Sequence, residues 1–187
     1  MQRYEWERPG DLNYVVFKTL ARLCKVGHRI TVDRQKGRSY GDAYNKDHVA
    51  VDDATRLAYI EVLADERKPT MIGLLGRSIA FFHSDGIECR RMMSDHRPSY
   101  VYKAFAKTCH TLGLRHTCTR PYTPLTNGKA ERFIQTLYPE WAYAMAYPYS
   151  KERKRWLPSY LAICNWLRTH SALGWRSSHQ QFAELLR

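Results

Sequence analysis

The sequence predicts an α/β fold, in which a central sheet is covered by helices on both faces. Two neighbouring segments, residues 47–52 and 57–63, are nearly continuous apolar runs joined by a short turn, which is typical of a hairpin buried on both faces. Residues 68–84 then place apolar side chains at helical spacing. The rest of the chain alternates between the two kinds of segment, which gives the order β-β-β-α-β-α-β-α.

Length and charge limit the classes of protein that fit. The chain has 187 residues, enough for one domain with a sizeable core. Its net charge of +12 is uneven, because residues 95–187 hold 14 Lys or Arg against 5 Asp or Glu. A basic half indicates a polyanionic partner, with nucleic acid as the first candidate and a merely solubilising surface as the alternative.

Cysteine usage and hydropathy favour a cytoplasmic protein without membrane contact. The five cysteines form no C-x-x-C pair, which fits scattered thiols in a reducing compartment better than a disulfide framework or a zinc site. The first residues lack the apolar core of a signal peptide. The most apolar run, residues 71–82, is interrupted by Arg77 and is too short to span a bilayer.

The remaining elements follow from composition and spacing. We expect a first strand at residues 12–18, then mostly loop from 21 to 46 with a short strand at 29–32. Further on, the patterns predict a strand at 87–93 closed by Ser94 and Asp95, a helix at 99–112 and a strand at 114–119. They also predict helices at 128–147, with a kink or break at Pro139, and at 151–169. The packing stripe predicted for the last helix includes Trp156, Tyr160, Ile163 and Leu167.

The segment from Arg120 to Leu137 joins an ordered loop to a helix. Pro121 and Pro124 forbid helix in the loop, and Thr126 and Asn127 are good N-cap residues for a helix that begins near Gly128. Glu131 would then lie about one turn into that helix, where the helix dipole favours an ionised carboxylate. Such a carboxylate suits a metal ligand, although an ordinary capped helix with solvated charges would have the same composition.

Several blocks of the sequence resemble one family. Thirty-five residues separate Asp95 from Glu131, which resembles the Asp and Glu of the retroviral-integrase catalytic core. The loop at residues 121–133 resembles bacterial insertion-sequence transposases that carry this core, as do the blocks at 9–12, 48–59 and 170–174. The resemblance implies a ribonuclease-H-like fold with a mixed five-stranded sheet, its first three strands antiparallel and helices on both faces. We expect residues 1–147 to form this core and 148–187 a helical extension packed on it.

The resemblance also implies a catalytic site with one departure from the family. Related proteins hold two Mg²⁺ (or Mn²⁺) ions with three acids, and the matching positions for two of them are Asp95 and Glu131, the predicted catalytic and metal-binding residues. The first acid belongs at the position of Val16, which offers no ligand. Asp11 would lie on the opposite face of the strand, about 16 Å away. Asp52 and Asp53 fall at the far end of the hairpin.

A second departure follows the strand acid. Where the family reads Asp-Asn-Gly, this chain reads Asp95-His96-Arg97-Pro98. Glycine there would permit a tight turn beside the metals, whereas Arg97 adds bulk and a cation that either pairs with Asp95 or faces solvent or a phosphate. Together with Val16, this change predicts a weakened metal site and impaired strand transfer.

DNA contact does not require the complete set of acids. Arg120, Lys129, Arg132 and Gln135 match the region where the family positions DNA ends, so we expect them to contact the DNA backbone. The basic run at residues 151–155 is either a further contact or a solvated helix face. We expect a homo-oligomer on DNA, associated with the nucleoid. Because the chain begins almost at the core, recognition of transposon ends is expected to be lost or supplied elsewhere.

Three functions are therefore open. The first is an integrase-core, transposase-type protein for DNA integration by Mg²⁺-dependent strand transfer, impaired by Val16. The second is a non-catalytic remnant that binds DNA or a partner protein. The third, a ribonuclease-H-like nuclease acting on hybrids, shares the fold and metals, but the loop at residues 121–133 favours the transposase branch.

Overall fold

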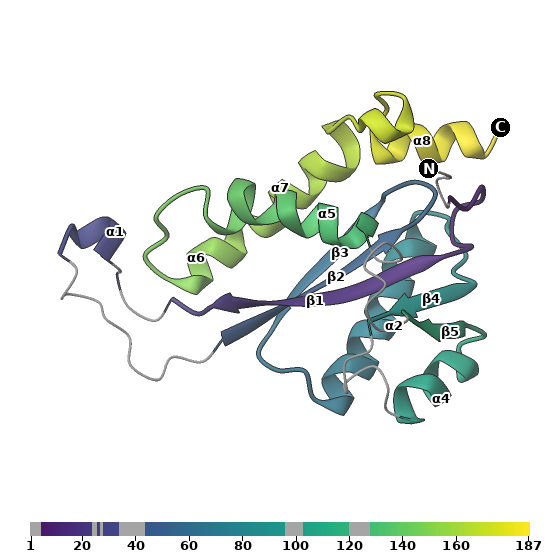
Figure 1. Cartoon of the computed structure of the whole chain (residues 1–187), viewed down its shortest axis with the longest axis horizontal. Helices are drawn as coiled ribbons and strands as arrows, with labels where there is room; N and C mark the ends of the chain where they lie inside the picture. The colour runs from purple at the N-terminus through teal and green to yellow at the C-terminus, as the bar shows by residue number, and fades with distance from the viewer. Residues whose placement is uncertain (1–4, 24–25, 27, 34–43, 96–102, 120–127) are drawn as a thin grey trace.

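A mixed sheet of five strands forms the centre of the molecule, in the order β3-β2-β1-β4-β5 (Figure 1). The computed structural model describes residues 5–23, 26, 28–33, 44–95, 103–119 and 128–187. The strands are β1 (Asn13–Ala21), β2 (Tyr44–Asp52), β3 (Ala58–Leu63), β4 (Arg91–Ser94) and β5 (Arg115–Cys118). β1, β2 and β3 pair antiparallel, whereas β4 and β5 join in parallel. The predicted fold class and hairpin are confirmed.

Helices cover both faces of this sheet, as expected. Figure 1 shows α2 (Lys68–Ser84) and α4 (Lys103–Thr111) on one face, and α5 (Gly128–Leu137), α6 (Ser150–Arg155) and α7 (Leu157–Ala162) on the other. Because strand side chains alternate between faces, β1 serves both cores. Val15 and Phe17 pack with α2 and α4, while Tyr14 and Val16 pack with α5.

The bounds of α2 agree with the prediction, and those of the helix before β5 agree within the described residues. α2 has Pro69 in its first turn, where a missing N–H costs nothing, and buries one face through Met71, Leu74, Leu75, Ser78 and Phe82. In α4, Phe105 and Cys109 are buried. Residues 99–102 of the predicted helix lie outside the described part of the chain.

Three predicted elements need correction. Residues 29–32 are not a strand, because helix α1 spans His28–Thr31. The helix that starts at Gly128 does not continue to Tyr147: α5 ends at Leu137, and the wider turn η2 (Tyr138–Ala142) follows. Pro139 lies at the start of that turn and lacks the N–H that would continue the α-helical pattern.

The predicted helix over residues 151–169 is also interrupted. It is divided into α6, α7 and the π-helical turn η3 (Ile163–Leu167), with Pro158 in the first turn of α7. The predicted packing stripe is wrong at Trp156, Ile163 and Leu167, which are exposed. It is correct at Tyr160, which packs against the core. The buried side chains in this region are Arg153, Leu157, Cys164 and Asn165.

Polar side chains in this region bind the sheet. Asn165 pairs with both backbone groups of Ala58, accepting from its N–H at 3.0 Å and donating to its carbonyl at 2.8 Å. Arg153, one of the basic run predicted as a possible DNA contact, is buried and donates to the carbonyl of Ala21 at 2.8 Å. The chain ends with η4 (Ser171–Leu173) and α8 (Ser178–Leu185), whose capping box joins Ser177 and Gln180.

Candidate active site

Val16, Asp95 and Glu131 line one hollow of about 410 Å³, although they come from three different elements. Val16 lies on β1, Asp95 directly follows β4, and Glu131 lies in the first turn of α5. In the parallel pairing of β1 with β4, Val15 is opposite Ser94, so the next residues, Val16 and Asp95, lie beside each other. The structure therefore brings together the two predicted acids and the predicted position of the missing one.

The local fold explains how each side chain reaches the hollow. α5 buries Ala130, Ile134 and Leu137 against the sheet. Glu131 and Gln135 are one turn apart on the neighbouring flank, which leaves both exposed at the edge of the hollow. Val16 is 4% exposed and packs in the core beneath α5.

The donor set fits one hard cation better than two. Two carboxylates face the hollow, and Mg²⁺ in proteins is commonly bound by one or two carboxylates together with phosphate oxygens. Among the described residues, no three His, Cys, Asp or Glu side chains are grouped so that they could hold a metal ion. Val16, which also lines the hollow, offers no oxygen ligand.

Lys18 and Tyr138 also line the hollow, and neither was predicted as a site residue. Lys18 follows Val16 by two positions on β1, so the period-two rule for strands could have placed it on the same face. Tyr138 follows Glu131 by seven positions, two helical turns further on, although it belongs to η2. Lys18 is exposed and brings an ammonium group that can bind a phosphate oxygen to the edge of the acidic pair, whereas the hydroxyl of Tyr138 is buried.

Asp47 is the acid on β2 closest to this site in the sheet register. It pairs with Lys18 across β1 and β2, two positions from Val49, the partner of Val16. Its side chain is nevertheless fully buried and is not part of the hollow. Burial raises the pKa of Asp47 to about 6, an effect that the nearby charge of Arg153 only partly offsets.

The four predicted DNA-binding residues lie in different surroundings. Gln135 lines the hollow, and Arg132 is exposed on α5, with its guanidinium 3.5 Å from the side-chain oxygen of Gln135. Lys129 instead turns into the protein, where its Nζ lies 2.5 Å from a carboxylate oxygen of Asp53. Arg120 lies outside the described residues, as do His96, Arg97 and the predicted N-cap at Thr126 and Asn127.

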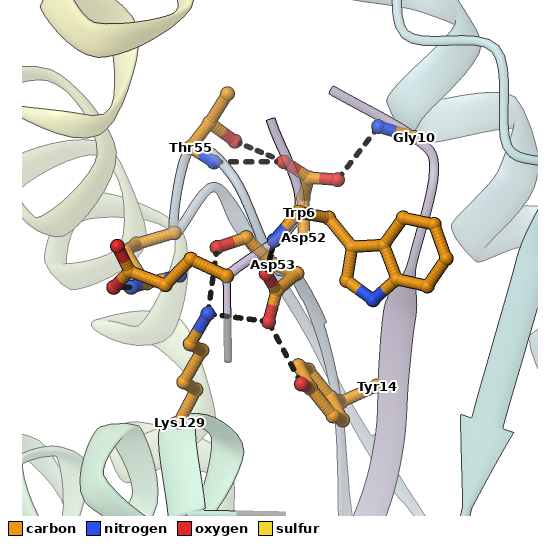
Figure 2. Close-up of polar contacts among 9 residues, drawn as sticks. Trp6, Gly10, Tyr14, Asp52, Asp53, Thr55 and Lys129 are labelled. Atoms are coloured by element: carbon orange, nitrogen blue, oxygen red, sulfur yellow. Dashed lines mark hydrogen bonds and ion pairs between the residues drawn. The ribbon is translucent and has the colours of Figure 1, made fainter. Parts of the chain in front are cut away.

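A second acidic pair, Asp52 and Asp53, ends β2 and lies against the start of α5 (Figure 2). Asp53 is buried and accepts hydrogen bonds from the backbone N–H of Trp6 (2.7 Å), the hydroxyl of Tyr14 (2.7 Å) and Lys129 (2.5 Å). The predicted position of this pair at the end of the hairpin is correct. Its connection to Lys129 was missed, because 76 residues separate the partners and no local pattern signals the contact.

Asp52 is held just as completely. One carboxylate oxygen accepts from the N–H of Gly10 (2.8 Å), and the other accepts from the N–H and hydroxyl of Thr55 (2.9 and 2.7 Å). Burial raises the pKa of Asp52, and these hydrogen bonds oppose that shift. Burial likewise lowers the pKa of Lys129, opposed by its contact with Asp53. The pair joins the N-terminal segment, β2 and α5, so its oxygens are already used within the fold.

Solved structures with this architecture support the fold assignment. The chain superposes on a chain of the simian T-cell lymphotropic virus intasome, solved with PP2A regulatory subunit B56 gamma, with a TM-score of 0.71 at 18% identity over 97% of this chain and 57% of that one. It also matches the HTLV-2 integrase catalytic core domain in complex with magnesium (TM-score 0.62, 14% identity, 93% of this chain and 97% of that one). The fold is thus the ribonuclease-H-like fold of integrase catalytic cores.

Sequence comparison gives the family. Two models, each described as an integrase core domain, match residues 25–124 and 112–177, and the first alone spans more than half of the chain. The chain belongs to the integrase core domain family. It is also 31% identical over 88 residues to the retrovirus-related Pol polyprotein from transposon TNT 1-94 of Nicotiana tabacum, covering 46% of this chain but 6% of the polyprotein. Within the part of the chain that the structure describes, no helix is both long and apolar enough to cross a bilayer.

Proposed function

We propose that this chain is the core of a DNA-integration or transposase-type protein whose phosphodiester strand transfer is impaired by Val16. The observation that carries the proposal is the single hollow shared by Val16, Asp95 and Glu131. Its position next to β1 and β4, in a family of integrase cores, supports assigning the reaction to this hollow.

In this proposal, Asp95 and Glu131 hold Mg²⁺ or Mn²⁺ between them. When bound, such an ion would lower the pKa of an attacking hydroxyl and neutralise charge on the phosphate. Val16 supplies no oxygen, so the chain's own residues hold the ion from two sides only. Gln135 and Lys18, at the edge of the hollow, would bind the phosphate oxygens of the DNA and fix the backbone relative to the two acids.

The proposed partner is DNA, contacted through its backbone by Arg132 and Gln135 and by the loop that contains Arg120. Lys129 is assigned a different role from the one predicted. Its ion pair with Asp53 fixes the first turn of α5, two residues before Glu131, so it positions the helix instead of contacting DNA. Nucleoid association would follow from backbone binding that depends on charge and not on sequence.

The alternative is a non-catalytic remnant that binds DNA or a partner protein. One observation favours it besides Val16: the large apolar side chains of Trp156, Ile163, Trp166 and Leu167 are exposed near the end of the chain. Exposed apolar groups in one region mark a contact surface more often than an ordinary solvated face. This surface would support an oligomer on DNA, either a homo-oligomer of this chain or a mixed oligomer with active relatives.

The experiment that tests the proposal is strand transfer on a labelled DNA end with Mg²⁺ or Mn²⁺. The native chain should stay near background, while Val16→Asp should join DNA at least about 100-fold faster, since a restored metal ligand contributes several kcal/mol to the barrier. Val16→Asn is the matched control, because it has a similar size without the negative charge. Activity of the native chain equal to that of Val16→Asp would refute impairment by Val16. If the native chain and Val16→Asp are both inactive, the non-catalytic remnant is the favoured function.

A further inference from the structure

A second hollow, of about 440 Å³, lies on the other flank of α5. α5 contributes Lys129, Arg132, Phe133 and Thr136 to it, whereas Glu131, Ile134 and Gln135 line the candidate active site. The opposite wall comes from the C-terminal segment, residues 168–172, together with Tyr160 and Cys164. α5 therefore separates two hollows, and its exposed Arg132 and Gln135 lie on the ridge between them.

Three residues lining this second hollow have buried nitrogen atoms without a hydrogen-bond partner among the described residues: Nη1 of Arg56, Nε of Arg168 and Nε2 of His170. Each of the two arginines uses another nitrogen in an ion pair, Arg56 with Glu5 at 2.7 Å and Arg168 with Glu140. Buried donors without acceptors are costly and uncommon in folded proteins. An acceptor-rich ligand would offset that cost once these side chains shift to expose the nitrogens to the hollow.

The charges around the hollow indicate an anion. Its lining contains three arginines and one lysine but one acid, Glu5. Arg56, Arg168 and Lys129 are each ion-paired with an acid, whereas Arg132 is exposed and forms no ion pair with the described residues. The surroundings of His170 are also positively charged. Burial lowers the pKa of its imidazole, and the cations of Arg168 and Arg56 lower that pKa further. A phosphate matches planar guanidinium groups through several charge-assisted hydrogen bonds.

The rest of the lining favours a nucleotide over a free phosphate ion. Phe133 and Tyr160 are partly buried aromatic side chains of this hollow, and aromatic faces beside a cationic groove stack the bases of single strands. The ridge of α5 is about 10–12 Å wide with its side chains, a width that a short stretch of strand can cross. A strand held at Gln135 would thus reach Arg132 and then the second hollow.

We propose that the hollow formed by Arg56, Arg132, Arg168 and His170 binds one nucleotide unit of a single DNA strand, with its phosphate on the arginines. This inference rests on the proposed function, because the strand is the one whose phosphodiester enters the hollow of Asp95 and Glu131. The second hollow needs no divalent ion, so it holds the strand even where the candidate active site is incomplete. In this chain, the DNA strand is therefore bound at one hollow, and strand transfer is assigned to the other.

The test uses the native chain in EDTA, so that no divalent ion contributes. A short single-stranded oligonucleotide is titrated while the imidazole signals of His170 are followed by NMR, with His170→Gln to assign them. The expected result is a shift of the His170 signals that saturates together with binding measured by fluorescence anisotropy. Binding without any shift at His170 would overturn the proposal. A shift produced equally by inorganic phosphate at the same concentration would overturn the assignment to a DNA strand.

Two variants support the NMR experiment. Arg132→Gln removes an exposed cation whose only described hydrogen bond is the 3.5 Å contact with Gln135, so its fold should be intact. It should weaken oligonucleotide binding about tenfold and reduce the salt slope by about one. Arg155→Gln, an exposed cation on α6 that lines neither hollow, should change affinity less than twofold. Equal losses in the two variants would indicate diffuse charge and no site. The strand-transfer assay of Val16→Asp tests the hollow of Asp95 and Glu131 instead. The proposed strand transfer and the proposed nucleotide site can therefore fail separately.

Discussion

The two acidic pairs beside α5 differ in their surroundings. Asp52 and Asp53 are buried, and N–H and O–H groups from the N-terminal segment, the β2–β3 turn and α5 saturate them. Asp95 and Glu131 instead line a hollow, and Glu131 is exposed. A carboxylate whose oxygens are already bonded within the fold cannot also hold a metal without breaking those bonds. The first pair therefore stabilises the fold, whereas the exposed carboxylate of Glu131 in the second pair can reach a ligand in the hollow.

The difference also explains why no nearby acid replaces the one missing at Val16. Asp52 and Asp53 are hydrogen-bonded to Gly10 and Tyr14 at the start of β1, and Asp11 is paired with Arg90 at 3.2 Å. Asp47 lies near Val16 in the sheet register but is fully buried. Each acid close to β1 in sequence or register thus has a structural reason to stay out of the hollow.

The largest effect on unfolding free energy is expected at Gly10, whose backbone N–H bonds to Asp52 of the structural pair. Gly10 has φ +81°, and a Cβ there would lie 2.1 Å from the carbonyl oxygen of Glu88. Gly10→Ala should cost about 5 kcal/mol of unfolding free energy, because the Gly10 backbone cannot move away from Glu88 without breaking its hydrogen bond to Asp52. Gly113→Ala is the control, since Gly113 also has positive φ (+72°) but nothing within 4 Å, so about 1 kcal/mol is expected. Equal costs by urea unfolding would refute the role of close packing at Gly10.

The next effect contrasts two residues in the first turn of α5. Lys129→Met leaves the buried carboxylate of Asp53 without its cation and should cost about 4 kcal/mol. Glu131→Gln changes an exposed group at the hollow and should alter stability by less than about 0.5 kcal/mol. Thermal and urea unfolding of the two variants provide the measurement. A larger loss for Glu131→Gln would reverse the assignment of structural and ligand-binding acids.

A smaller effect is the dependence of unfolding free energy on pH. It arises from two buried titratable side chains, Asp47 and His48, on opposite faces of β2. The pKa of Asp47 is raised to about 6, so its stabilisation is full below about pH 4 and is lost as pH rises to 6. The pKa of His48 is lowered by burial to about 4, so its stabilisation is full above about pH 6.5 and is lost as pH falls to 4. The two dependences have opposite signs and similar size, roughly 3 kcal/mol each.

Stability of the native chain should therefore vary little between pH 4 and 6.5. Asp47→Asn should leave the dependence of His48, so that stability falls as the pH is lowered. His48→Gln should leave that of Asp47, so that stability falls as the pH is raised. Urea unfolding across this range checks both signs. A steep dependence in the native chain that both variants retain would mean that other groups control it.

Much of the fold was predictable because its signals are local. The spacing of apolar residues gave the bounds of α2, and the apolar runs on either side of the short turn gave the hairpin. The later helices were predicted less well. Pro158 and the wider turns η2 and η3 divide them, and the predicted stripe through Trp156 and Leu167 is exposed although its spacing fits a helix. Periodicity identifies a helical face without showing whether the protein or the solvent covers it.

The candidate site was predictable in part. Asp95, Glu131 and Val16 line one hollow, while the catalytic and metal-binding roles assigned to these positions stay predictions. Lys129 was grouped with the DNA contacts because a cation beside a predicted acid is indistinguishable, in sequence, from one paired with an acid 76 residues away. The second hollow was missed because Arg56 and His170 meet only in three dimensions. The boundary predicted between residues 147 and 148 stays a prediction.

The most direct test of the central claim is the affinity for Mn²⁺, measured by electron paramagnetic resonance or calorimetry on the native chain and on Val16→Asp. If Asp95 and Glu131 form a site that lacks its third ligand, Val16→Asp should bind Mn²⁺ at least about tenfold more tightly, and adding Glu131→Gln should abolish the gain. Equal affinity of the native chain and Val16→Asp would contradict the claim, because position 16 would then contribute nothing to the metal site.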